Sequence, residues 1–130
     1  MPIIDIKPTT TVIRDWSKVA TNVDLKPGDK TTISFLPNVP SECLPEGFVF
    51  VYLYSVNVKD KKEAAIECAV DGNEVGTHFL SPAPHNHCEI IFEVTGSIKY
   101  GEMNQIVLLN AGQSGLLIDT VEVFWVLRMK

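Results

Sequence analysis

Residues 48–58 read FVFVYLYSVNV, and this stretch decides the fold that we expect. Aromatic, β-branched and leucine residues fill consecutive positions without the 3.6-residue period of an amphipathic helix, which is typical of a β-strand. Both the even and the odd positions are apolar in its first half, so we expect a central strand that is covered on both faces. Tyr54 lies where the stretch begins to alternate with polar residues.

Further β-rich segments lie on either side of this strand, and turn-forming residues separate them. The sequence Asp71-Gly72-Asn73-Glu74 predicts a hairpin turn, because its residues favour a tight reversal between two strands. Residues 37–47 contain three prolines and end in Gly47, which predicts a long ordered loop. Residues 81–84 hold two more prolines and interrupt the pairing. The expected strands cover residues 11–16, 18–25, 31–36, 48–58, 63–70, 75–80, 87–94, 104–110 and 116–128.

This spacing of about eight short strands, without any helical segment, predicts an all-β protein. We expect an antiparallel two-sheet β-sandwich of the jelly-roll type. The 130 residues show no internal repeat, linker or low-complexity segment, so residues 1–130 are expected to form a single domain.

Charge and hydropathy exclude several classes of protein. The formal net charge is −5, and no cluster of cations is present to neutralise phosphates, so we expect no nucleic-acid partner. No apolar run approaches the roughly 20 residues that span a bilayer, so membrane insertion is not expected. Residues 1–5 lack the basic start and apolar stretch of a signal peptide, so no signal peptide is expected in this chain.

The three cysteines do not form a recognisable motif. Cys43, Cys68 and Cys88 are an odd number, and none belongs to a C-x-x-C pair, so zinc-knuckle and thioredoxin sites are not expected. Cys68 shares a strand face with Ile66 and Val70, which predicts a small buried side chain. Reduced thiols would suit a cytoplasmic protein or an assembled particle, and one disulfide with one free thiol remains an alternative.

All three histidines fall within ten residues. If His85 and His87 lie on a strand, they share a face and could bind a metal together with His78. This spacing is similar to the His-x-His of the cupin metal motif, but no histidine follows residue 87 and Glu89 and Glu93 stand at other offsets. The alternative is that these histidines are partly solvated loop and strand residues. No nucleophile elbow, phosphate-binding loop or assignable carboxylate pair is present, so we do not expect an enzyme.

Aromatic residues are the remaining candidates for ligand contact, because sugars stack their C–H faces on exposed rings and bond their hydroxyls to amides and carboxylates. Trp16 lies near a strand end and Tyr100 lies in a loop beside Gly101, so these two rings are the best candidates for exposure. Trp125 lies in a run that is apolar on both faces and is expected in the core.

The second half of the chain resembles the galactose-binding-like jelly rolls, which include families of non-catalytic carbohydrate-binding modules. The resemblance covers about residues 64–126. It rests on AVDGNEVGT at 69–77, on FEVTGSIKYGEMNQIVL at 92–108 and on GLLIDTVEV at 115–123. Met103 is an insertion relative to the Gly-Glu-Asn entry of the penultimate strand in those families.

The resemblance implies a sugar site on loops at one end of the sandwich, with an aromatic platform and an asparagine near the last strands. It points to Trp16, Tyr100, Asn104 and Asn110 as ligand-binding residues, with Gln113 as a further polar loop residue. Such modules often hold a structural calcium, and the oxygen donors near the front of this chain are Asp5, Asp15 and Asp24.

Three hypotheses follow from the sequence. The first is a lectin-like, non-catalytic carbohydrate-binding β-sandwich. The second is a structural or assembly subunit, such as a virion, appendage or homo-oligomer protein, in which exposed rings would serve as interface anchors. The third is a cupin-like metal protein that uses His78, His85 and His87. We rank them in this order.

Overall fold

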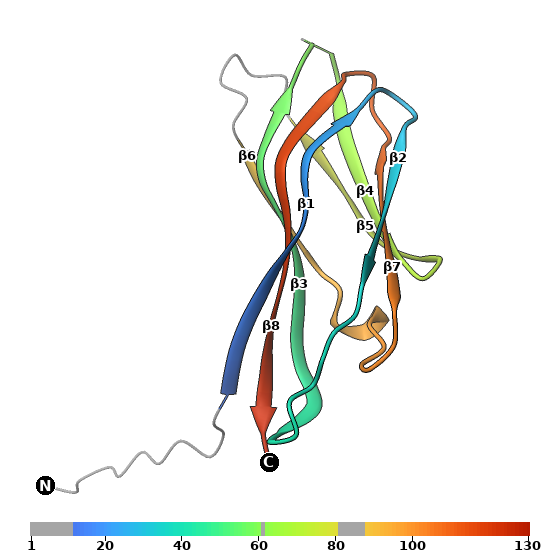
Figure 1. The fold of residues 1–130 in the computed structure, drawn as a ribbon. Helices are drawn as coiled ribbons and strands as arrows, with labels where there is room; N and C mark the ends of the chain where they lie inside the picture. Colours follow the sequence, from blue (N-terminus) through green and yellow to red (C-terminus); the bar gives the residue numbers. More distant parts are fainter. Residues whose placement is uncertain (1–11, 61, 81–87) are drawn as a thin grey trace, which may run out of the picture.

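In the computed structural model, the described residues form eight antiparallel strands in two four-stranded sheets (Figure 1). The structure describes residues 12–60, 62–80 and 88–130, with side chains from residue 17 onward. Sheet A has the strand order β1-β8-β3-β6, and sheet B has the order β2-β7-β4-β5. A 3₁₀ turn, η1 (Thr95–Ser97), follows β6. The strands are β1 (Val12–Leu25), β2 (Lys30–Phe35), β3 (Cys43–Val58), β4 (Ala64–Val70), β5 (Asn73–Leu80), β6 (Cys88–Glu93), β7 (Asn104–Asn110) and β8 (Leu116–Met129).

The strand pairs are nested, as in a long hairpin that has been rolled into a sandwich. The centre of this hairpin is the β4–β5 turn, where Asp71 and Gly72 have φ angles of 51° and 82°. Two successive positive φ angles are typical of the tight turn that Asp-Gly sequences favour. Outward from this turn β3 pairs with β6, β2 with β7 and β1 with β8. This arrangement is a jelly roll, so the expected fold class is confirmed.

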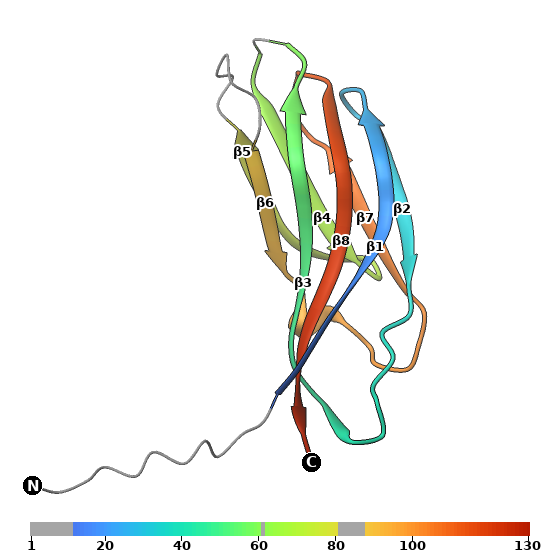
Figure 2. The same ribbon diagram turned by 60° about the vertical axis from the view of Figure 1, so that its left-hand side comes forward.

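The core lies between the two sheets, which Figure 2 shows with sheet A in front and sheet B behind. Alternate residues of each strand point inward, since successive side chains of a strand lie on opposite faces. Val49, Val51 and Leu53 of β3 are fully buried, and they face Ile66 and Cys68 of β4 across the core. Burying one such aliphatic side chain contributes about 1.5–3 kcal/mol. Trp125 and Cys68 are buried as expected.

Most expected strand bounds lie within two residues of the structure, and two segments differ by more. The segments 11–16 and 18–25 form one strand, β1, whose register with β8 shifts between Lys18 and Ala20. This irregularity lets the strand continue where the pattern suggested a break. The predicted loop 37–47 is shorter, because β3 already begins at Cys43, which pairs with Met129. The long β8 provides main-chain partners for this additional segment.

The outer face of β3 corrects a further expectation. The even positions from 48 to 54 are apolar, but no third layer among the described residues covers them: Phe48 and Tyr54 are 55% and 47% exposed. The odd positions face the core. A two-layer sandwich covers only one face of each sheet, so β3 is central within its sheet but open on its outer side.

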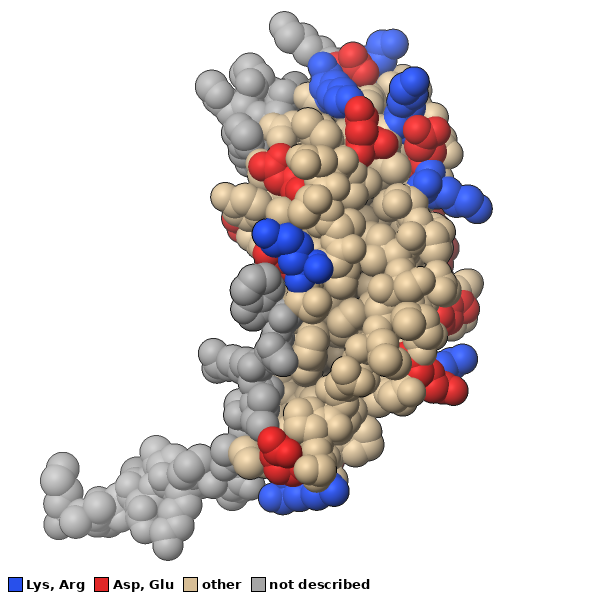
Figure 3. Space-filling model, viewed as in Figure 1, with Lys and Arg blue, Asp and Glu red and all other residues tan. Residues whose placement is uncertain are grey.

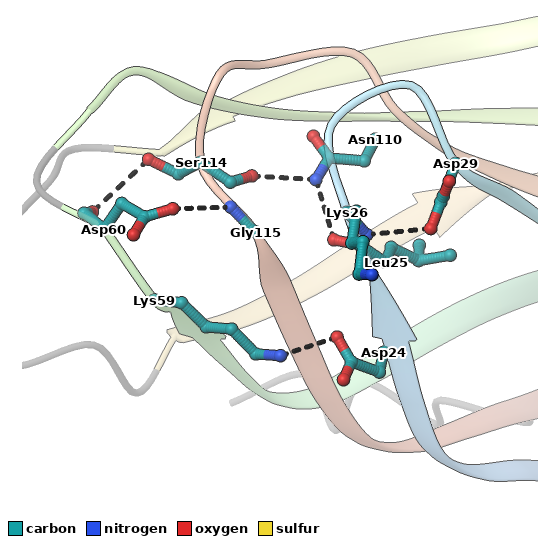
Figure 4. A network of polar contacts seen from close by, with 9 residues as sticks. All are labelled: Asp24, Leu25, Lys26, Asp29, Lys59, Asp60, Asn110, Ser114 and Gly115. Atoms are coloured by element: carbon teal, nitrogen blue, oxygen red, sulfur yellow. Dashed lines mark hydrogen bonds and ion pairs between the residues drawn. The ribbon is translucent and has the colours of Figure 1, made fainter.

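Charged residues gather at the upper end of the sandwich, while the middle of the face in Figure 3 is uncharged. The loops β1–β2, β3–β4 and β7–β8 meet at this end (Figure 4). Lys59 Nζ lies 2.6 Å from the Asp24 carboxylate, and Gly115 N donates to Asp60 at 3.2 Å.

No helix in the described part of the chain has the length and apolar character needed to span a bilayer.

Candidate functional site

A row of aromatic rings follows β3 on the outer side of sheet A. Phe48, Phe50, Tyr52 and Tyr54 occupy alternate positions of the strand, and Phe124 of β8 lies beside them. We call these five residues the aromatic face. Its length follows from the strand itself, since the six steps from residue 48 to residue 54, at 3.3–3.4 Å each, span about 20 Å.

The rings of the aromatic face contact one another in sequence. The centroids of Phe48 and Phe50 are 6.3 Å apart, with nearly parallel planes at 19°. Phe124 bridges the row, at 5.5 Å from Phe50 and 6.1 Å from Tyr52. Tyr52 and Tyr54 are 6.3 Å apart. Such offset ring pairs stabilise one another, so the face is held in place without a covering layer.

Acidic residues lie on both sides of the aromatic face. Glu122 of β8 is paired in register with Tyr52, and Glu93 of β6 is paired with Phe50. The Tyr52 hydroxyl donates to the carboxylate of Glu89. Desolvation, this hydrogen bond and the negative charges of Glu89 and Glu122 raise the pKa of Tyr52 to about 12. The Tyr52 hydroxyl therefore stays protonated at neutral pH and remains a hydrogen-bond donor.

A pocket of about 420 Å³ opens at the upper end of the aromatic face, where it is lined by Tyr54, Ser55, Cys88, Glu89 and Asp119. The pocket lies at a β-bulge, since the register of β3 and β6 shifts between Leu53 and Val56 and Ser55 has a φ of 55°. Bulges of this kind re-aim side chains and are frequent beside binding sites. One ring wall and two carboxylates can together hold an apolar surface that carries hydroxyl groups.

Tyr100 lies away from the aromatic face, in a second pocket of about 430 Å³. This pocket is bordered by the segment 38–45 and by the C-terminal Lys130. The Tyr100 ring is half-buried, and its hydroxyl is buried without a hydrogen-bond partner among the described residues. Burial raises the pKa of this hydroxyl. Tyr100 thus lines a cavity, as a ligand-contacting residue would, but it lies apart from the other rings.

Asn104 and Asn110 are fully buried, and their amides hold the ends of β7. Asn104 Nδ2 donates to the carbonyls of Lys99 and Glu102, and its Oδ1 accepts from Lys99 N at 2.9 Å. Asn110 Nδ2 donates to the carbonyls of Leu25 and Ser114 (Figure 4). Both side chains therefore fix loops, and neither lines the aromatic face or its pocket.

The remaining candidate residues are only partly described. His78 is exposed on β5, where its Nε2 lies 3.2 Å from the Ile91 carbonyl and its ring meets Phe92 edge-on. His85, His87 and Asp5 lie outside the described residues, as do the side chains of Trp16 and Asp15. The backbone of Trp16 is paired with that of Phe124. Asp24, the remaining calcium candidate, pairs with Lys59.

The cysteines and the potential metal ligands are the remaining reactive side chains. Cys43, Cys68 and Cys88 are all free thiols. Burial raises the pKa of Cys68 to about 12, so this thiol is unreactive at neutral pH. Among the residues whose positions are described, no group of three or more His, Cys, Asp and Glu side chains is arranged to hold a metal ion.

The aromatic face was not among the sites predicted from the sequence, although its residues lie in the stretch that predicted the fold. The signal that could have found it was the row of rings at even positions, since core strands favour aliphatic side chains on both faces. Tyr54 alone was noted, as the place where polar alternation begins.

The comparisons with known proteins give no family for this chain. No family model matches it, and no curated protein matches it. Solved structures match with high probability but at low identity, so they show the fold alone.

Three solved structures illustrate the range of proteins that share this fold. One is the CBM36-1 carbohydrate-binding module of a multidomain xylanase from the hindgut metagenome of Trinervitermes trinervoides (TM-score 0.51, 14% identity), where the match covers 88% of this chain and 96% of that domain. Another is BuGH86 in complex with neoagarooctaose (TM-score 0.62, 16% identity, 92% of this chain and 19% of that chain). A third is a latent aurone synthase, a polyphenol oxidase (TM-score 0.62, 11% identity, 87% and 29%).

The chain thus spans less than a third of the length of the two enzymes. Its fold is a β-sandwich of the kind found in carbohydrate-binding modules and in parts of larger carbohydrate-active enzymes.

Proposed function

We propose that this chain is a non-catalytic carbohydrate-binding module that binds glycan chains on the aromatic face. The observation that supports this function best is the row of four rings along β3, of which Phe48 and Tyr54 are about half exposed. Monomeric proteins rarely leave such a contiguous apolar strip uncovered unless it binds something. The strip is long and narrow, so it suits an extended chain of sugar rings better than a single sugar.

The polar groups beside the rings match the hydroxyls of a sugar. Tyr52 donates to Glu89, and both groups retain capacity for further hydrogen bonds. Asp119 and Glu89 can accept hydrogen bonds from sugar hydroxyls at the pocket beside Tyr54. The similarity in fold to the CBM36-1 module supports the same class of ligand. In this proposal the rings bind the C–H faces of the sugar, and the carboxylates orient it.

A glycan-array screen with three proteins tests this function. The wild type is expected to bind a coherent family of glycans, while a Phe48→Ala/Tyr54→Ala double variant is expected to bind at least tenfold more weakly. Both replaced side chains lie outside the core, so the fold should persist. The matched control is Phe79→Ala, which removes a ring that is 73% exposed on sheet B. A blank array for the wild type, or equal loss in the control, would contradict the proposal.

A second candidate function is that of an assembly or interdomain docking subunit. Two further exposed apolar side chains favour it: Phe79 on β5 of sheet B, and Ile91 on β6, which is 49% exposed and is paired with Tyr52 beside the ring row. Exposed aromatic side chains are frequent anchors of protein interfaces. Under this function the protein forms a stable oligomer at micromolar concentration in a sedimentation experiment, and Ile91→Ser dissociates it. A monomer at high concentration would contradict this function.

A further inference from the structure

The charges around the aromatic face indicate which glycans it can accept. Glu122 lies on the β8 side of the ring row, and Glu89 and Glu93 lie on the β6 side. Asp119 adds a fourth carboxylate at the pocket beside Tyr54. The rings are therefore bordered by acidic groups along both sides and at one end.

Few cations balance these carboxylates in the described part of the chain. On the outer side of sheet A, Lys18 of β1 lies opposite Glu122 in register. Arg128 lies at the lower end of β8, where its guanidinium is 3.5 Å from Glu46. The described lysines otherwise gather mainly in the loops at the upper end of the sandwich (Figure 3). The local charge at the rings is thus negative, as is the net charge of the whole chain.

The Tyr52 hydroxyl lies within this negative field. Desolvation and the hydrogen bond to Glu89 raise its pKa most, and the charges of Glu89 and Glu122 act in the same direction, so that the pKa is about 12. A field that opposes ionisation of a phenol also opposes the approach of a sulfate or carboxylate group to the same position.

We propose that the aromatic face selects linear glycans without anionic groups, and that Glu89, Glu122 and Asp119 repel sulfated and uronate-containing chains. This inference rests on the proposed function, since it names the ligand class of the same site. The rings would bind any glycan with an accessible C–H face. The carboxylates then discriminate against anionic chains, because like charges in contact are unfavourable. Two carboxylates at roughly 6 Å from a ligand anion in water weaken binding about tenfold.

Matched pairs of glycans test this selectivity by calorimetry. Each pair shares a backbone and differs in charge: methyl-esterified and free-acid oligogalacturonide, unsulfated and sulfated galactan oligosaccharide, cello-oligosaccharide and its carboxymethylated form, and plain and glucuronate-substituted xylo-oligosaccharide. We expect the uncharged member of any bound pair to bind up to about tenfold more tightly at 20 mM salt. This difference should fall to about twofold at 0.5 M salt, where the Debye length is a few ångströms.

Charge-removing variants identify the residues responsible. Glu89→Gln and Glu122→Gln together should reduce the difference between the two members of a pair to threefold or less at 20 mM salt, whatever their effect on the binding of the uncharged member alone. Glu74→Gln is the matched control, since Glu74 is exposed at the start of β5 in sheet B. It should leave the difference unchanged.

The outcomes separate this inference from the proposed function. If any anionic member binds as tightly as its uncharged partner at low salt, the selectivity is overturned while carbohydrate binding stands. If no member of any pair binds, the proposed function fails and the selectivity fails with it. If the double variant keeps the full difference, the assignment to Glu89 and Glu122 is overturned.

Discussion

Replacing Asn110 by alanine should destabilise the fold strongly, because its side-chain amide makes three hydrogen bonds to loop backbone groups. Its Nδ2 donates to the Leu25 carbonyl at 2.9 Å and to the Ser114 carbonyl at 2.8 Å, and its Oδ1 accepts from Gly112 N at 3.1 Å. The residue is fully buried, so water has little access to the groups that would be left unpaired. These bonds join the β1–β2 turn to the β7–β8 loop (Figure 4).

The magnitude follows from the number of bonds. A hydrogen bond contributes about 1 kcal/mol net, and a buried group left without its partner costs about 1–3 kcal/mol. Three lost bonds therefore lower the free energy of unfolding by about 3 kcal/mol. For a domain of this size 1 kcal/mol corresponds to roughly 4 °C, so the melting temperature should fall by about 12 °C. Asn110→Asp should be at least as harmful, since it sets a carboxylate against the two carbonyls that the amide now donates to.

Urea unfolding followed by circular dichroism measures this loss. The matched control is Asn38→Ala, which alters an exposed asparagine in a loop and should change stability by less than about 0.5 kcal/mol. A loss below about 1 kcal/mol for Asn110→Ala would refute the reasoning, because it would mean that the buried carbonyls find other partners. A variant that folds should keep its glycan binding, since Asn110 lies apart from the aromatic face.

Three further predictions concern stability. Gly112→Ala should lower the free energy of unfolding in urea by about 1–3 kcal/mol, because the added Cβ would lie 2.6 Å from Ala65 N. The control is Gly76→Ala, whose Cβ meets nothing within 4 Å and which should change stability by less than about 0.5 kcal/mol. Equal losses for the two variants would contradict this prediction. Burial raises the pKa of Cys68 to about 12. The buried neutral thiol therefore stabilises the fold fully below pH 9, and this contribution is lost as the pH rises toward 12. Stability should therefore fall by up to about 1.4 kcal/mol per pH unit in this window, and Cys68→Ala should flatten the profile; an unchanged slope would argue against this cause. Lys59→Met removes the ion pair with Asp24, in which the two side chains are 43% and 56% exposed. We therefore expect thermal unfolding to show a loss of stability below about 1 kcal/mol. A larger loss would show that solvent screens the pair less than its exposure implies.

The fold was largely predictable, because strand composition and turn chemistry act locally. The expected strand 104–110 coincides with β7, and Asp71-Gly72 forms the hairpin turn at the centre of the nested pairs. The failures occurred where a distant partner decides the local structure. β3 extends back to Cys43 because Met129 provides a pairing partner, and no pattern within residues 37–47 reveals this.

The candidate site was harder to predict than the fold. Whether an apolar strand face is covered depends on the number of layers, which residues 48–58 do not reveal. The contacts that shape the site also join distant segments, as in the pairing of Phe50 with Phe124. Asn110 is an example of a residue that was expected in the site and instead holds the fold together. A polar residue near the last strands suggested ligand contact, but its amide bonds to Leu25, which is 85 residues away in the chain.

Mapping by NMR tests the central claim most directly. The isotope-labelled protein would be titrated with the uncharged oligosaccharides of the matched pairs, and amide shifts followed across both sheets. We predict that a bound oligosaccharide shifts residues 48–54 of β3 and 120–124 of β8, and leaves β2 and β5 of sheet B unchanged. Shifts confined to the pocket around Tyr100, or no shifts with any of these chains, would contradict binding on the aromatic face.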